Sequence, residues 1–215
     1  MIGRLSFIAA LLAAPMALAQ DTPTPPTAGQ IAAARAEADR IIAAADADAL
    51  FVNITGDARA TVRHKASGMI CTFFGSPEVD RIVIFDGKGN DVGCSTRLDD
   101  YKMELTLYAT RYEPMLTEQQ ALASAVSAIR DRFPSARPFE GSVGEVGVGS
   151  DIRPLSESLL IETTQGPMFT MAIVSHPDEW AFKARATGPE VHGTEISVAA
   201  GVGFYRMLVL RTLPD

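Results

Sequence analysis

The sequence predicts an α+β domain, in which helices pack on a mostly antiparallel sheet and an Ala-rich N-terminal helix precedes the sheet. Three observations support this fold class. Apolar residues recur at helical spacing in 28–50, whereas a period of two dominates from residue 51 to about 112. A second helix start lies at Thr117 and is followed by further strand-like segments. Because strands and helices do not alternate regularly, a parallel βαβ arrangement is not indicated.

The first twenty residues, MIGRLSFIAALLAAPMALAQ, have the layout of a secretory signal peptide. Arg4 precedes an apolar run from Leu5 to Ala14, and Ala17-Leu18-Ala19 supplies small residues in an A-x-A arrangement. The run is shorter than the roughly 20 apolar residues that a membrane-spanning helix needs. We therefore expect cleavage after Ala19, a periplasmic or secreted mature protein, and no membrane span in the mature chain; the alternative is an uncleaved anchor.

This leader sets the expected domain organisation: residues 1–19 form the signal peptide, 20–27 form a Pro/Thr tether, and 28–215 form a single α+β domain. The tether, QDTPTPPT, favours extended backbone because proline cannot donate to a helix or a sheet. Loss of Arg4 changes the net charge to −7 − 1 = −8. Such an acidic chain repels phosphate groups at a distance, so nucleic acid is not an expected partner.

The segment 28–50 predicts an amphipathic helix with a thin apolar stripe. Alanine has high helix propensity but little surface to bury, so we expect this helix to dock loosely on the rest of the fold. The stripe consists of Ile31, Ala34, Ala38, Ile41, Ala45 and Ala49.

Several short strands follow from residue 51. The continuous apolar run from Ile82 to Phe85 predicts a strand that is buried on both faces, and "DGKGND" after it predicts a hairpin turn. The clearest half-buried strand lies in 101–113, where Met103, Leu105, Leu107 and Ala109 alternate with polar residues.

The second half of the chain predicts a helix, three strands and one ambiguous element. Thr117 and Gln120 form a capping box, and Pro134 ends the helix that they begin. Residues 141–150 predict a loop. The segment 194–212 fits a strand or a helix, and its length favours the helix. The last of the three strands places Trp180, Phe182, Ala184 and Ala186 on one face and Lys183 and Arg185 on the other.

The two cysteines, Cys71 and Cys94, predict a disulfide in an exported protein. A simple meander would place them about 9.5 Å apart, on either side of a central strand. A bridge requires Cα atoms within about 7 Å. We therefore expect 91–97 to leave the sheet and fold back beside 69–73. The alternatives are two unpaired core thiols, or a metal site with His64, for which no C-x-x-C spacing exists.

No catalytic motif or cofactor motif is present in the sequence. The patterns G-x-S-x-G and S-x-x-K and a cysteine beside a histidine are all absent. His64 is a candidate functional histidine, although its alternation with Arg63 and Lys65 is typical of a buried strand residue. We expect a non-enzymatic envelope accessory or binding module. The alternative is a hydrolase-like enzyme whose nucleophile is assembled only in the fold.

A candidate binding surface lies on the polar face of the strand in 101–113. Tyr108, Thr110 and Tyr112 share that face and would present an aromatic strip to a protein, peptide or glycan of the cell envelope. The alternative is that a helix covers these tyrosines and uses them for packing.

Three segments, "VRHKASGMIC", "NDVGC" and "YATRY", resemble exported alphaproteobacterial proteins of unknown function. The resemblance spans roughly Phe51 to Pro138. It implies export and no particular activity.

The leader and the disulfide predict a defined mass for the protein recovered from the periplasm. The mature chain should begin at Gln20, and an alkylating reagent should add no mass before reduction and two adducts after it. Intact-mass spectrometry measures both. A full-length chain retained in the cytosol with two alkylated thiols would contradict the export prediction.

Overall fold

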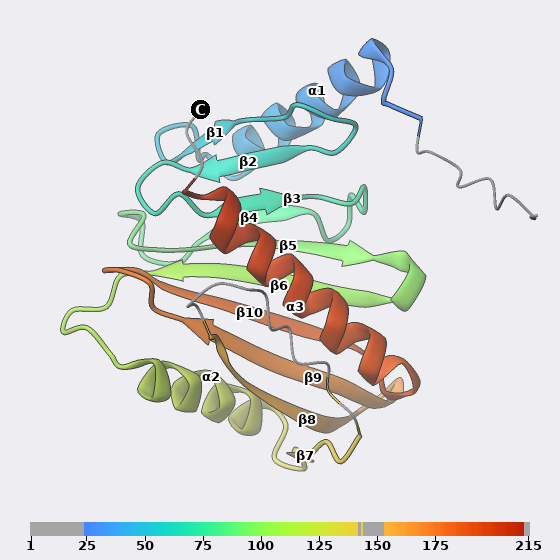
Figure 1. The fold of residues 1–215 in the computed structure, drawn as a ribbon, viewed down its shortest axis with the longest axis vertical. Coiled ribbons are helices and arrows are strands. Elements are labelled where there is room, and N and C mark those ends of the chain that lie inside the picture. The colour runs from blue at the N-terminus through green and yellow to red at the C-terminus, as the bar shows by residue number, and fades with distance from the viewer. Residues whose placement is uncertain (1–23, 142, 144–152, 213–215) are drawn as a thin grey trace, which may run out of the picture.

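The computed structural model describes residues 24–141, 143 and 153–212. These residues form two antiparallel sheets with three α-helices, which confirms the α+β fold class (Figure 1). The larger sheet contains, in spatial order, β4 (Arg81–Ile84), β5 (Asp91–Leu98), β6 (Met103–Thr110), β10 (Ala181–Pro189), β9 (Gly166–Ser175), β8 (Leu155–Thr163) and β7 (Arg137–Pro138).

The smaller sheet stacks at one end of the molecule together with the N-terminal helix. It contains β1 (Phe51–Asn53), β2 (Thr61–His64) and β3 (Ile70–Thr72), and α1 (Ala28–Ala44) packs on it and on β4. A capping box of Thr27 and Gln30 begins α1. The buried residues of this helix are Ala34, Ala38, Ile41 and Ile42; the expected stripe was too long, since the helix ends before Ala49.

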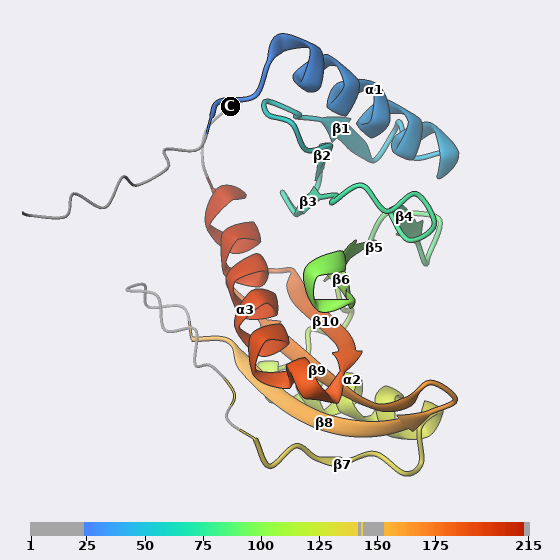
Figure 2. The same cartoon turned by 90° about the vertical axis from the view of Figure 1, so that its right-hand side faces the viewer.

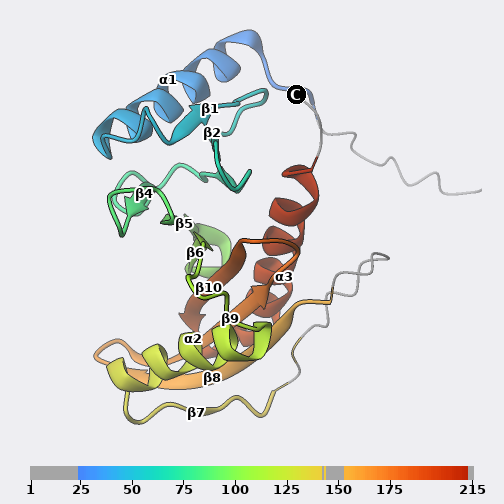
Figure 3. The same ribbon diagram turned by 90° about the vertical axis from the view of Figure 1, so that its left-hand side faces the viewer.

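The other two helices lie on opposite faces of the seven-stranded sheet (Figures 2 and 3). The helix α3 (Gly193–Leu210) follows the 3₁₀ turn η2 (Glu190–His192) and packs on β10, β9 and β6, which confirms the helical interpretation of this segment. We call the face beneath α3 the inner face. The helix α2 (Glu118–Arg132) begins at the predicted capping box and packs on β8 and β9 from the opposite side, the outer face.

The main hydrophobic core lies between the inner face, α3, α1 and the smaller sheet. The alternating residues Met103, Leu105, Leu107 and Ala109 of β6 are all buried in it, as predicted. A second cluster beneath α2 contains Val126, Ile129, Leu159, Ile161 and Ala172. Two cores on opposite faces explain why β9 is apolar on both sides.

The prediction of a doubly buried strand at 82–85 is wrong. Of these four residues only Ile82 is buried, and the Phe85 side chain is 53% exposed. The reason is topological, because β4 is the edge strand of the larger sheet and pairs only with β5. The 3₁₀ turn η1 (Asp99–Tyr101) links β5 to β6 farther along the chain.

The predicted disulfide is present, and it joins the two sheets. Cys71 of β3 and Cys94 of β5 have Cα atoms 6.2 Å apart, and their side chains are 0% and 4% exposed. The predicted departure of 91–97 from the sheet is wrong, because β5 pairs along its length with β6 and also with β4. Instead β3 leaves the larger sheet and pairs with β2.

A buried carboxylate holds the connection between the two sheets. The Oδ2 atom of Asp80 accepts the amides of Gly75 and Ser76, each at 2.9 Å. Its Oδ1 atom accepts the Thr96 hydroxyl of β5 at 2.7 Å, and that hydroxyl accepts the amide of Phe74 at 3.0 Å. These bonds turn the chain after β3 away from the plane of the larger sheet, so that Cys71 lies over Cys94 and not beside it.

The sequence also predicts that the mature chain has no membrane span. Among the residues that the structure describes, no helix combines the length and the apolar character needed to cross a bilayer.

The disulfide predicts a measurable contribution to stability. Its loop of about 24 residues corresponds to about 3.5 kcal/mol in the chain-entropy treatment. The double variant Cys71→Ala/Cys94→Ala should therefore lose about that much free energy of unfolding in urea, and its midpoint should not respond to reductant. The reduced wild-type protein is the matched comparison. An unchanged midpoint in both would show that the inter-sheet tie is dispensable.

Candidate functional site

The outer face of the larger sheet is only half covered. Because α2 packs on β8 and β9, the outer face of β4, β5, β6 and β10 is left open beside the end of that helix. A hollow of about 440 Å³ lies there, which we call the outer groove. Its lining residues are Arg81, Val83, Phe85, Ser95, Glu104, Thr106, Tyr108, Arg132, Phe133, Arg185 and Thr187.

The floor of the outer groove is a row of four residues on adjacent strands. The strand register aligns Arg81 with Ser95, Ser95 with Thr106, and Thr106 with Arg185. Ser95 and Thr106 share a hydrogen bond of 3.1 Å between their hydroxyl groups. The row therefore has a guanidinium group at each end and two hydroxyl groups between them.

An aromatic pair forms one wall of the groove. The rings of Phe85 and Tyr108 have centroids 5.9 Å apart and planes inclined by 30°. They meet above Gly93, where an added Cβ would lie 2.9 Å from the Leu107 carbonyl oxygen and 3.4 Å from the Phe85 ring. Glycine is thus required at this strand position by the close approach of its neighbours.

The end of α2 forms the opposite wall. The guanidinium carbon of Arg132 lies 5.4 Å from the centroid of the Phe133 ring, and that of Arg185 lies 6.0 Å from the same centroid. Two cations from different elements therefore share one aromatic ring. Their like charges repel each other, and an anion close to both would offset this repulsion.

Arg185 is the least satisfied charge in the groove. Its Nε atom is buried and has no hydrogen-bond partner, and among the described residues neither Arg185 nor Arg132 has an ion-pair partner. Burial lowers the pKa of Arg185; Tyr108 opposes this shift and the positive charge of Arg132 adds to it. A partly buried cation without a partner is unfavourable, and an anionic group in the groove would compensate it.

Two carboxylates on the outer face are engaged by other arginines. Glu104 accepts from Arg97 at 2.7 Å, and Glu157 accepts from Arg130 at 2.9 Å. Neither is bonded to Arg185 or Arg132. The local charge of the groove is therefore positive, although the whole chain carries a net charge of −7.

The structure brings together two of the three residues predicted as a binding surface. Tyr108 lines the outer groove, and Tyr112 lies close by, since the Lys183 ammonium lies 5.4 Å from both ring centroids and donates to the Tyr112 hydroxyl at 3.0 Å. Thr110 is buried and donates to Asp91 at 2.7 Å. Tyr108 is thus the member of the predicted surface that borders open space.

The sequence reasoning missed the residues that dominate the groove, namely Arg185, Arg132 and Phe85. The alternation in 180–186 did place Arg185 on the polar face, which was a usable signal. Its meeting with Arg132 was not predictable locally, because α2 and β10 are brought together only by the order of the strands.

His64 lies in the core and not at a surface. Its side chain is 0% exposed and is enclosed by Phe51 and Trp180, with ring centroids at 5.0 and 5.5 Å. Its Nδ1 atom lies 2.8 Å from the Ser67 hydroxyl and accepts the Ser67 amide at 3.3 Å. The Ser67 hydroxyl in turn accepts the amide of Met69 at 3.1 Å. These bonds close the hairpin between β2 and β3.

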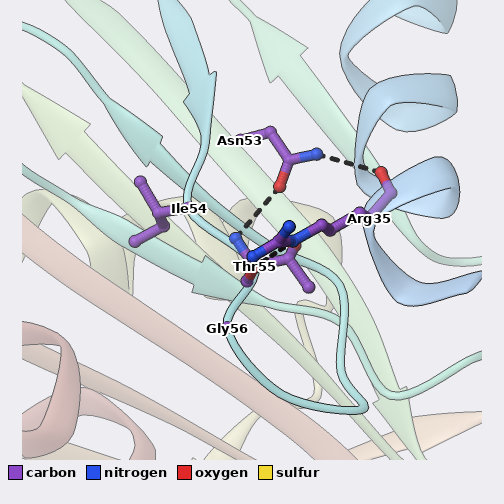
Figure 4. A pocket seen from close by; sticks show the side chains of 5 residues that line it. All are labelled: Arg35, Asn53, Ile54, Thr55 and Gly56. Atoms are coloured by element: carbon purple, nitrogen blue, oxygen red, sulfur yellow. Dashed lines mark hydrogen bonds between the residues drawn. The ribbon is translucent and has the colours of Figure 1, made fainter. Parts of the chain in front are cut away.

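Another hollow is lined by polar groups that hydrogen-bond to one another. Figure 4 shows the groups that line it between α1 and β1. The Asn53 amide nitrogen donates to the Arg35 carbonyl at 2.9 Å, Arg35 Nε donates to the Thr55 carbonyl at 2.9 Å, and the Thr55 amide donates to Asn53 Oδ1 at 3.0 Å. The polar groups therefore serve to fix α1 on the smaller sheet.

The described residues contain no group of three or more His, Cys, Asp or Glu side chains arranged to hold a metal ion.

The burial of His64 predicts a loss of stability in mild acid. Burial lowers its pKa from 6.5 to about 4, so the unfolded chain binds the proton first as pH falls. Stability should be complete above pH 6.5 and should fall by about 3 kcal/mol as pH approaches 4. Urea unfolding at several pH values should show a shallower decline in this window for His64→Gln than for the wild type. The control His192→Gln, at a partly exposed residue, should keep the wild-type slope. Equal slopes for His64→Gln and the wild type would contradict this assignment.

Comparison of the chain with protein-family models gave no match, and no curated protein matches it significantly. The geometry of the outer groove and the burial of His64 are therefore the observations that bear on function.

Proposed function

We propose that this protein is an exported, non-enzymatic binding module of the cell envelope and that its ligand occupies the outer groove. The observation that carries the proposal is the Arg185 guanidinium in the floor of an open hollow, which has no ion-pair partner among the described residues. Charged side chains that are removed from water are normally paired. An unpaired one beside open space is typical of a site that receives an oppositely charged group.

The architecture of the groove also favours binding. Its floor consists of four hydrogen-bonded strands, and the opposite face of those strands is packed in the main core. Side chains on such a floor are held in place before a ligand arrives, which reduces the entropy cost of binding. The exposed ring of Phe85 adds apolar surface next to the charged row.

Export is supported by two independent features. One is the disulfide between Cys71 and Cys94. Disulfides persist in oxidising compartments and are rare in cytosolic proteins. The first nineteen residues have the layout of a cleaved leader.

The hydrolase alternative has less support. It requires a histidine beside a nucleophile that a substrate can reach. Ser67 lies within hydrogen-bond distance of His64, but both residues are buried and neither lines the outer groove. The Ser67 hydroxyl is also engaged in closing the hairpin.

Site-specific photo-crosslinking in the envelope tests the proposed location of the ligand. A photoreactive amino acid in place of Phe85 should give a discrete adduct after irradiation of intact cells, because this ring borders the groove. The same amino acid in place of Val191, which is 80% exposed in η2, should not give that adduct. Mass spectrometry of the purified protein detects the adducts of both variants. No adduct at position 85, or the same adducts at both positions, would contradict the proposal.

A further inference from the structure

We propose that the ligand of the outer groove is an acidic peptide segment, with one carboxylate bound between Arg185 and Arg132 and a second bound by Arg81. This inference rests on the proposed function and specifies its ligand class. It follows from the placement of the three arginines, from the rings between them and from the width of the row.

The first carboxylate position is defined by the two cations at Phe133. The guanidinium groups of Arg185 and Arg132 both lie over this ring, at 6.0 and 5.4 Å from its centroid. Planar guanidinium groups bind carboxylates through paired hydrogen bonds. Because both side chains line the groove, a carboxylate bound between them would offset the repulsion between the two cations.

The second position is defined by the other end of the row. Arg81 lies on β4 and Arg185 on β10, so three strand spacings of about 4.8 Å separate their backbones by about 14 Å. An extended peptide advances about 13 Å over four residues and presents residues i and i+4 on the same face. Two acidic residues four positions apart therefore match the two ends of the groove. The Ser95 and Thr106 hydroxyl groups lie between them.

The rings of the groove favour a peptide over an acidic glycan. A sugar ring binds aromatic side chains by stacking on an open face. Lys183 occupies a face of Tyr108, and Arg132 and Arg185 occupy the Phe133 ring. The 53% exposed ring of Phe85 remains as an apolar contact at the side of the row. An aliphatic side chain next to an acidic residue fits this surface.

Fluorescence anisotropy with a synthetic peptide tests the ligand class. The probe is a labelled, extended peptide with two glutamates four positions apart and leucines beside them, titrated with the oxidised mature protein. Binding should saturate, weaken at high salt, and weaken at least tenfold when both glutamates are replaced by glutamine.

Protein variants locate the binding to the groove. Arg185→Gln and Arg132→Gln should each weaken binding at least tenfold, because each removes one half of the carboxylate position. The matched control is Arg40→Gln, which lies on α1 and is paired with Glu37 outside the groove; it should bind like the wild type. If Arg185→Gln fails to fold, the exposed Arg132 decides the result.

The outcomes separate the ligand class from the proposed function. A peptide that does not bind, or that binds equally to the Arg132 and Arg40 variants, overturns the peptide assignment. Binding of an oligouronate instead, with the same dependence on Arg132, overturns it in favour of a glycan. In both cases an adduct at position 85 would still support a ligand in the groove, whereas its absence would remove the proposed function as well.

Discussion

The tie between the two sheets is the constraint on which the rest of the structure depends. Cys71 and Cys94 join β3 to β5, and Asp80 fixes the turn that brings them together. This tie places the smaller sheet and α1 over the inner face of β4 and β5, while α3 covers the neighbouring strands. The buried apolar side chains of β5, β6 and β10 lie on this inner face, and the outer face of these strands carries polar and charged groups.

The two long strands β5 and β6 connect the core to the groove directly. Cys94 and Leu107 face each other on the inner side, and their sequence neighbours Ser95 and Thr106 face each other on the outer side. A shift of one residue in this register would exchange the two sets. The disulfide therefore stabilises more than the core, because it also fixes which side chains line the outer groove.

Local sequence patterns predicted the elements well but not their long-range arrangement. The alternation from Met103 to Ala109 and the capping box at Thr117 depend on neighbouring residues, and both are present as expected. The disulfide followed from the leader and the cysteine count. The exposure of Phe85 and the approach of Arg132 to Arg185 depend on which strand lies at the edge and on where α2 ends. Arg132 meets Arg185 because α2 packs across β8 and β9, next to β10, and no local period contains this arrangement.

The charge arrangement on the outer face indicates why an anion would bind beside Arg185 and not elsewhere on this face. Arg185 is opposite Ala172 on the neighbouring strand, and Glu157 follows on the next one, where Arg130 holds it at 2.9 Å. Glu104 is likewise held by Arg97. Glu104 and Glu157 are thus both paired with arginines that do not line the groove. Ala172, opposite Arg185, is packed beneath α2 and supplies no side-chain acceptor, so the guanidinium has no counter-charge from this neighbouring strand. A carboxylate at this point would offset part of the desolvation cost of the partly buried guanidinium. Arg185 therefore lacks a counter-charge among the described residues at a place where an anionic ligand would supply one, as expected for a binding surface.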